Sequence, residues 1–195
     1  MLTSWRERLS RPHSPSGYRP GYTLDHVRRN LQATEWLVVQ PTLAEFRCSG
    51  SGQILHVQER VESHLLMHVV LTEFHLQVSA AFQGTMRLEM RHTGAMCRTG
   101  LACLFRSGDK SLFSQAEAGL VKDSALLDAL MPLDFKHLII ECREGHWRVV
   151  IEHMGGSEVV NRMPAFRRYI QISQEQKGYL WKAFARLEDK LINLQ

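Results

Sequence analysis

The sequence predicts a single α+β domain in which a mostly antiparallel meander sheet packs against a long C-terminal helix. Apolar and polar residues alternate along many short segments, as they do in strands with one covered face. No helical segment separates consecutive strands within these stretches, so neighbouring strands are expected to run antiparallel. The C-terminal segment instead has apolar residues three and four positions apart, the spacing of an amphipathic helix. We therefore expect about nine strands in two blocks, with one or two further helices.

Residues 1–22 are predicted to form a flexible basic arm, and residues 23–195 are predicted to form the domain. The arm ends in SRPHSPSGYRPGY, whose three prolines and two glycines do not continue a helix. The order of elements in the domain also permits two blocks, 23–131 and 132–195. No residue-level repeat supports a duplication.

The first elements of the domain are a helix and two strand-like runs. A helix is expected from Thr23 to Ala33, because Thr23 is a suitable cap and apolar residues recur on one face. From Trp36 the period changes to two, and the SGSG turn at 49–52 separates the two runs.

The clearest alternation lies in TEFHLQVSA (72–80) and TMRLEMRH (85–92). We expect these two segments to pair as a hairpin joined at Phe82–Gly84. A further strand is expected within 95–106. Residues 113–131 return to helical composition, with an interruption near Asp123 and Ser124.

The second block of strands ends in the long helix. Ser173 is expected to cap this helix, with Gln176 as its capping-box partner. The expected strands are 137–142, 146–153, 157–162 and 167–172, and the apolar stripe of the helix is Leu180, Phe184, Leu187 and Leu191.

The formal charge of +4 is concentrated at the N-terminus. Residues 1–29 carry six basic and two acidic groups, and the other 166 residues carry 18 of each. Proteins that contact a phosphate backbone usually have a basic surface of their own, so nucleic acid is not the favoured partner. No apolar run approaches the ~18 residues of a membrane span, and the N-terminus lacks a secretory signal. The four cysteines have no paired spacing, so we expect reduced thiols in a cytoplasmic protein without a transmembrane segment.

Three histidines lie close together in the sequence: His64, His68 and His75. On a helix they would share one face and could bind a metal. The surrounding alternation favours a strand, on which His64 and His68 would lie ~13 Å apart and His75 would point to the opposite side. Two zinc bonds of ~2.1 Å do not span that distance, so no metal and no cofactor is predicted. Convergence of histidines from different strands stays open.

The favoured function is a small, non-catalytic binding or interaction protein. A sheet that grips a helix often leaves an apolar cleft between them, in which a small apolar ligand binds. The residues expected to line this cleft are Phe74, Leu76, Met86, Met90, Leu180 and Phe184.

The alternative is an accessory protein that binds anions or nucleic acid. Arg162, Arg167 and Arg168 crowd one predicted strand beside Tyr169, which suits phosphate or single-stranded nucleic acid. The Arg-rich N-terminal arm would also take part in this binding. An edge strand protected by charged residues has the same pattern.

An enzyme of unknown reaction is the third hypothesis. The sequence contains no nucleophile elbow, phosphate-binding loop, dinucleotide fingerprint or zinc-protease motif. Glu and His residues gather between 141 and 153, but a hairpin with polar residues on its solvent face has the same composition. No catalytic residue is therefore assigned, and oligomeric state is not predicted.

Overall fold

The structure is a computed structural model that describes residues 15–33, 35–48, 52–80, 83–94 and 97–194. The α+β class, the nine-stranded antiparallel sheet and the C-terminal helix are confirmed. The first 14 residues of the predicted arm lie outside these ranges. In chain order the elements are α1 (Tyr22–Leu31), β1 (Trp36–Gln40), β2 (Leu43–Arg47), β3 (Ile54–Ser63), β4 (Met67–Ser79), β5 (Met86–Thr93), β6 (Gly100–Gly108), α2 (Lys110–Val121), α3 (Ser124–Leu130), β7 (Phe135–Arg143), β8 (His146–Arg162), β9 (Ala165–Tyr169) and α4 (Gln174–Ile192).

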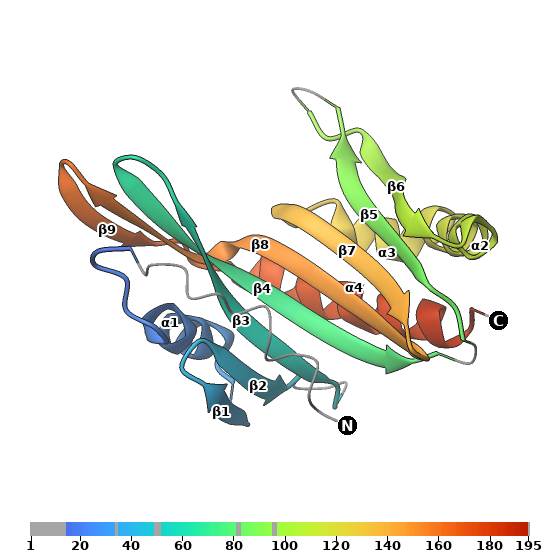
Figure 1. Cartoon of the computed structure of the whole chain (residues 1–195), viewed down its shortest axis with the longest axis horizontal. Coiled ribbons are helices and arrows are strands. Elements are labelled where there is room, and N and C mark those ends of the chain that lie inside the picture. The colour runs from blue at the N-terminus through green and yellow to red at the C-terminus, as the bar shows by residue number, and fades with distance from the viewer. Residues whose placement is uncertain (1–14, 34, 49–51, 81–82, 95–96, 195) are drawn as a thin grey trace.

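One sheet contains the strands of both sequence blocks, in the order β1-β2-β3-β4-β8-β7-β5-β6, with β9 paired to the end of β8 (Figure 1). The predicted hairpin between 72–80 and 85–92 is wrong, because β4 pairs with β3 and β8, whereas β5 pairs with β6 and β7. The 17-residue strand β8 is the physical reason. It occupies the edge of β4 that a local hairpin would have used.

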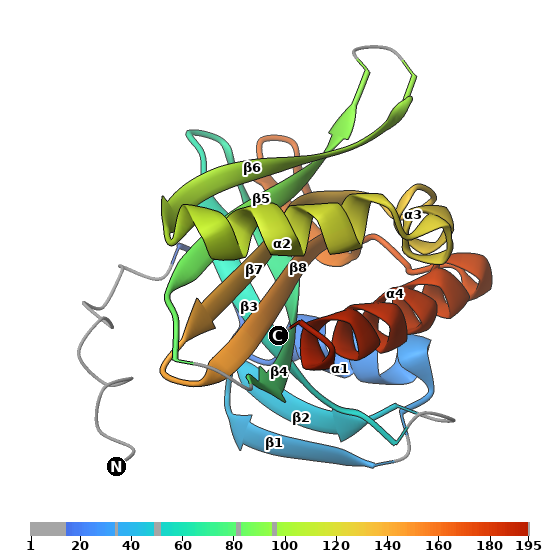
Figure 2. The ribbon, with the colours of Figure 1, turned by 90° about the vertical axis from the view of Figure 1, so that its right-hand side faces the viewer.

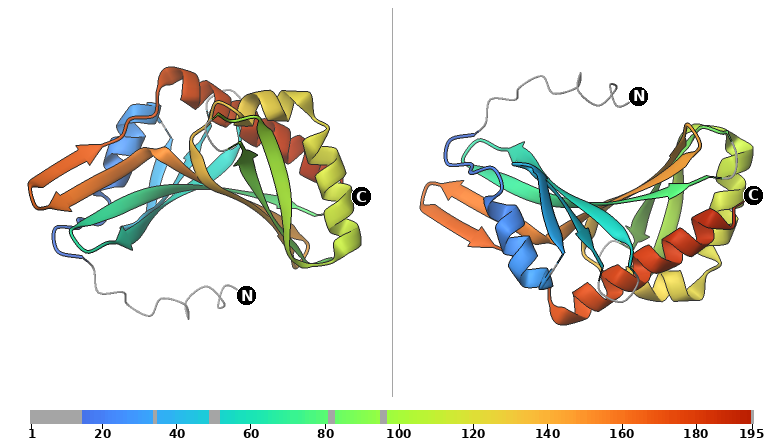
Figure 3. Two further views of the ribbon diagram at one scale, coloured as in Figure 1. Left: turned by 90° about the horizontal axis from the view of Figure 1, so that it is seen from above. Right: turned by 90° about the horizontal axis from the view of Figure 1, so that it is seen from below.

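The four helices of the described chain lie on one side of the sheet, which we call the covered face (Figures 2 and 3). Its apolar side chains form one core with the buried faces of the helices, including Phe74 of β4, Trp147 of β8 and Leu126 of α3. The opposite side, on which the described part of the chain places no helix, is the helix-free face. Glu73, His75 and Arg148 lie on it, in positions that alternate with buried neighbours.

Local signals in the sequence determine where α4 and α3 start. Ser173 and Gln176 form the predicted capping box of α4. Asp123 accepts a hydrogen bond from the Leu126 amide at 2.7 Å and starts α3, so the predicted interruption near residue 123 is confirmed. No helix in the described ranges is long and apolar enough to cross a bilayer.

A buried carboxylate positions α1 and the end of the arm. Glu59 of β3 accepts hydrogen bonds from the Gly21 and Leu24 amides at 3.0 Å, where a helix start has free N–H groups. It also accepts one from the Tyr18 hydroxyl at 2.7 Å. Burial and the neighbouring Glu59 raise the pKa of Tyr18 above its usual range. Tyr18 therefore anchors the chain before α1 to the sheet.

An irregularity in β8 bends the sheet. Thr72 pairs with His153 and Val70 pairs with Glu158, so residues 154–157 of β8 lie opposite Leu71 alone. Gly156 has a φ of 90° here, a conformation that favours glycine, and its carbonyl accepts a hydrogen bond from the Thr72 hydroxyl at 2.7 Å. Beyond this bulge, the ends of β3, β4, β8 and β9 continue as two hairpins (Figure 1).

Candidate functional site

The residues of the predicted cleft do meet between sheet and helix, but as packed core. All six are buried and belong to the main hydrophobic cluster. Three surface hollows in the described part of the chain are lined by other residues. The prediction of an apolar ligand therefore has no open cavity at Phe74, Leu76, Met86, Met90, Leu180 or Phe184 to support it.

The three arginines of the predicted anion site are separated. Arg167 lies on the covered face, where its guanidinium contacts both carboxylate oxygens of buried Glu158 at 3.0 and 3.1 Å. Arg168, the next residue on β9, points to the other side. Arg162 is exposed near the turn between β8 and β9. Only Arg162 and Arg168 are therefore exposed cations of this set.

The three neighbouring histidines lie in different environments. His64 is exposed in the turn between β3 and β4, and His75 lies on the helix-free face. His68 is buried on the covered face, edge-on to the Tyr18 ring at 6.5 Å. Within the described residues, no group of His, Cys, Asp or Glu side chains is arranged to hold a metal ion.

The centre of the helix-free face holds a group of ion pairs around Arg60. Its guanidinium contacts Glu73 at 2.8 Å and Glu62 at 2.9 Å, and it also contacts Glu152. Burial alone would lower the pKa of Arg60, but the three carboxylates raise it. Lys136 adds a second cation, 2.9 Å from Glu62, and its hydrogen bond lowers the pKa of that carboxyl. The buried carboxylate of Glu152 is thus held between two cations.

His75 extends this group along β4. Its Nε2 lies 3.3 Å from a Glu73 oxygen and its Nδ1 lies 3.3 Å from the Arg148 guanidinium. Burial lowers the pKa of His75, and the positive charge of Arg148 lowers it further, although Glu73 opposes the shift. The ring is therefore kept neutral near neutral pH.

A second group surrounds Glu89 of β5. Its carboxylate accepts hydrogen bonds from Arg91 at 2.5 Å and Arg106 at 2.6 and 2.9 Å, and it lies 2.9 Å from His137 Nδ1. Burial opposes ionisation of Glu89, but these three partners outweigh it and lower its pKa to about 2. Like the Arg60 group, this cluster pairs its charges within the face. Such pairing is typical of a structural surface, whereas a general acid or base needs a pKa near the working pH.

The first strand differs from the rest of the sheet because its apolar side chains are exposed on both faces. Leu37 is 61% exposed on the helix-free face and Val38 is 62% exposed on the covered face. β1 is also the end of the sheet and pairs only with β2 in the part of the chain that the structure describes. Natural edge strands are usually protected by charges, bulges or covering elements. WLVVQ contains no charged residue.

The backbone of β1 has hydrogen-bonding groups that face away from the sheet. The Glu35 carbonyl accepts a bond from the Arg47 amide at 3.3 Å, and Trp36 lies opposite Phe46. In an antiparallel pair, hydrogen-bonded and non-hydrogen-bonded positions alternate. The N–H and C=O of Trp36 and Val38 therefore point toward the free edge.

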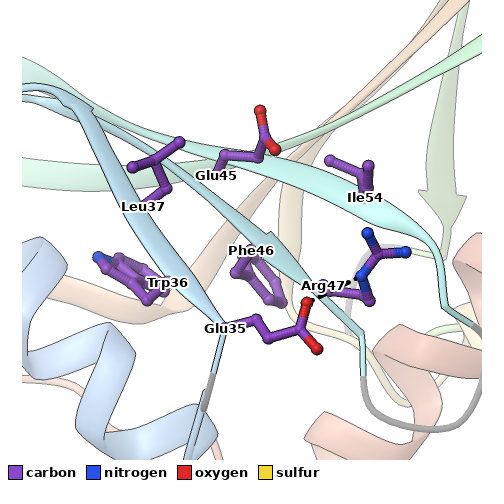
Figure 4. A pocket seen from close by; sticks show the side chains of 7 residues that line it. All are labelled: Glu35, Trp36, Leu37, Glu45, Phe46, Arg47 and Ile54. Atoms are coloured by element: carbon purple, nitrogen blue, oxygen red, sulfur yellow. Dashed lines mark hydrogen bonds and ion pairs between the residues drawn. The ribbon is translucent and has the colours of Figure 1, made fainter.

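Two hollows flank this edge. The first has a volume of about 190 Å³ (Figure 4). Leu37, Glu45 and Ile54 line this hollow from the helix-free face of the sheet. The ion pair between Glu35 and Arg47, with a distance of 2.9 Å, borders it. The second, of about 360 Å³, lies between β1 and the start of α1 and includes Val38. We call β1 with these two hollows the β1 edge.

The comparisons with known proteins identify a family. Residues 29–191 match the model of a family described as "Protein of unknown function (DUF3156)". The chain belongs to this family. No curated protein and no solved structure matches the chain.

The matched region of the DUF3156 chain includes the whole β1 edge strand and both projecting hairpins. The sequence contains a signal for this edge. Trp36, Leu37, Val38 and Val39 are four consecutive apolar residues, whereas a strand with one solvent face alternates. Such a run predicts burial on both faces, yet the structure leaves both faces of β1 open.

Proposed function

We propose that this chain is a binding protein that adds an extended segment of a partner protein to the β1 edge. The observation that carries the proposal is the combination of a backbone edge that no other described strand pairs with and apolar side chains exposed on both faces of β1. Strand addition uses such an edge: backbone hydrogen bonds supply affinity, and pockets for alternate side chains supply specificity.

The two hollows fit the geometry of an added strand. Successive side chains of an extended segment point to opposite faces of a sheet. A segment paired with Trp36 and Val38 would thus direct alternate side chains toward the hollow beside Leu37 and the hollow beside Val38. The hollow beside Leu37, of about 190 Å³, is smaller than the ~300–1,000 Å³ of sites for whole drug-sized ligands and suits a single side chain, and the hollow beside Val38, of about 360 Å³, lies at the low end of that range.

Charge favours a partner segment that combines apolar and basic residues. The hollow on the helix-free face is bordered by two carboxylates, Glu35 and Glu45, against one guanidinium, that of Arg47. A second copy of this chain would present the uncharged β1 strand to these carboxylates. A lysine or arginine at alternate positions of a partner would complement them instead.

The test is selection from a displayed library of extended peptides, followed by binding measurements with the full-length protein. We expect enrichment of peptides in which apolar residues alternate with lysine or arginine. Val38→Pro removes an outward N–H while proline is tolerated on an edge strand, so it should lower affinity by about tenfold or more. The matched control is Val38→Thr, which keeps the N–H and the branched shape and should bind nearly normally.

Hydrogen exchange identifies the bonds involved. The Trp36 and Val38 amides should exchange rapidly in the free protein and slow down when a selected peptide is added, because they would then donate to it. Equal binding by the proline and threonine variants would contradict strand addition. Absence of enriched peptides would also contradict it. Self-association of the protein that Val38→Pro abolishes would contradict it as well, because the β1 edge would then bind a second copy of this chain.

A further inference from the structure

Two hairpin turns project side by side from the end of the sheet opposite the free end of α4 (Figures 1 and 3). One is the turn between β3 and β4 at 64–66, and the other is the turn between β8 and β9 at 163–164. We call residues 64–66 and 162–166 the double-hairpin tip. It lies beyond the β8 bulge and is separate from the β1 edge.

Backbone hydrogen bonds join the two turns. The Arg162 amide donates to the Leu66 carbonyl at 2.8 Å, and Met67 pairs with Asn161. Within the first turn, the His64 amide donates to the Met67 carbonyl at 2.7 Å. The tip is therefore one ordered surface built from segments that lie about a hundred positions apart in the chain.

The tip exposes large apolar side chains. Leu65 is 90% exposed and Met163 is 74% exposed, the two highest values among the exposed large apolar residues of the described chain. Leu66 and Phe166 add roughly half-exposed side chains from the same two hairpins. Scattered exposed apolar residues are ordinary, but four at the ends of two adjoining hairpins form a patch, and such patches mark contact surfaces.

The charge around this patch is positive. Arg162 and Arg168 are exposed on the β8–β9 hairpin, whereas Arg167, which precedes Arg168 on β9, is held in its ion pair with Glu158. No Asp or Glu occurs in 63–72 or in 159–173. Apolar side chains at the end of a projection with arginines behind them match the layers of an anionic membrane surface, in which the headgroups lie outside the acyl chains.

We propose that the double-hairpin tip inserts its apolar side chains into the surface of an anionic lipid bilayer, with Arg162 and Arg168 against the lipid headgroups. The chemistry favours lipid over nucleic acid because the most exposed groups of the tip are aliphatic. Nucleic-acid surfaces of this size rely on aromatic stacking and on a larger positive charge. The inference does not depend on strand addition at β1, which lies elsewhere on the molecule.

The experiment is flotation of the full-length protein with vesicles of phosphatidylcholine containing about 30% phosphatidylserine, and with vesicles of phosphatidylcholine alone. We expect the protein to float with the anionic vesicles and to float several-fold less with the neutral ones. Raising the salt concentration should weaken but not abolish the binding, because the apolar contribution is not screened.

Paired variants separate the contribution of apolar insertion from that of attraction to the anionic headgroups. Leu65→Ser with Met163→Ser should lower the bound fraction about tenfold, because polar side chains do not insert. The control is Ile192→Ser, which changes an exposed apolar residue at the other end of the molecule. Arg162→Glu with Arg168→Glu should abolish the preference for anionic vesicles, and its control is Lys122→Glu with Arg143→Glu, two exposed cations elsewhere. Thermal unfolding of each variant checks that the fold is retained.

A further variant distinguishes the tip from the N-terminal arm, whose arginines also favour anionic lipid. Arg6→Glu with Arg8→Glu and Arg11→Glu should leave most of the vesicle binding in place. Loss of binding only in the arm variant would overturn the proposal. Absence of flotation with anionic vesicles would also overturn it. The proposal would likewise be overturned if the protein bound anionic vesicles and single-stranded oligonucleotides equally well and the serine variants left this binding unchanged.

Discussion

The two faces of the sheet are covered in different ways. On the covered face, four helices remove apolar side chains from water, and the buried faces of helices and strands form one core. On the helix-free face, charged side chains take over this role. Their charged groups pair with one another across the face, and apolar neighbours such as Val69 and Leu71 are buried among them. The covered face is therefore stabilised mainly by apolar burial and the helix-free face by a network of ion pairs. The stability of the protein should respond differently to substitutions on the two faces and to acid.

The largest effect is expected from truncation on the covered face. Phe184→Ala removes a fully buried ring from α4 and leaves a cavity, so the free energy of unfolding should fall by about 3–5 kcal/mol. Ile192→Ala on the same helix is the control, because Ile192 is about half-exposed and its truncation should cost less than about 0.5 kcal/mol. Urea unfolding of both variants makes the measurement. Similar losses would show that α4 is not packed on the sheet as described.

A smaller effect is expected on the helix-free face. Glu89→Gln keeps the side-chain shape but removes the charge that Arg91, Arg106 and His137 surround, and we expect a loss of about 1–2 kcal/mol at about pH 7. Glu141→Gln is the control, since the ion pair that Glu141 forms with Arg87 is longer, at 3.8 Å.

The same variant tests how this face responds to acid. The pKa of Glu89 is about 2 in the folded protein and 4.5 as an ordinary glutamate, so its ionisation stabilises the fold above about pH 4.5. That stability is lost as the pH falls from 4.5 toward 2, because the unfolded chain takes up the proton first. The stabilities of wild type and Glu89→Gln should therefore converge in this range. A constant difference between them would contradict the low pKa.

Much of the fold could be predicted from local signals. Alternation located most of the strands, Ser173 and Gln176 located the start of α4, and the break near Asp123 separated α2 from α3. These signals act within a few residues of each other. Strand pairing depends on residues that are far apart in the chain, which explains why the predicted hairpin between 72–80 and 85–92 was wrong. Nothing in either segment encodes that β8, about seventy positions away, lies against β4.

The candidate surfaces depended even more on distant partners. The arginines near residue 167 suggested one anion site, but Glu158 and the alternation of β9 leave only Arg162 and Arg168 exposed. The double-hairpin tip needs two turns that the chain brings together across the β8 bulge. For β1, the unbroken apolar run was visible in the sequence, but its position at the end of the sheet was not.

The smallest expected effect concerns the response of the covered face to acid, which differs from that of Glu89. His68 is buried beside Tyr18, and within the described residues neither ring nitrogen has a hydrogen-bond partner. Burial lowers the pKa of His68, as do the charges of Arg162 and Arg167, whereas Glu158 opposes them. The unfolded chain therefore binds this proton before the folded protein does. The stability that neutral His68 permits is present above about pH 6.5 and is lost as the pH falls below it.

His68→Phe removes this titration and keeps an aromatic ring against Tyr18. The slope of unfolding free energy against pH should become shallower below about pH 6.5, by at most ~1.4 kcal/mol per pH unit, the equivalent of one proton. His64→Phe, in the exposed adjoining turn, is the matched control. Because His68 responds below about pH 6.5 and Glu89 below about pH 4.5, mild acid should loosen the structure around His68 before the structure around Glu89. Hydrogen exchange at about pH 5.5 would contradict this order if amides around Glu89 lost protection before those around His68.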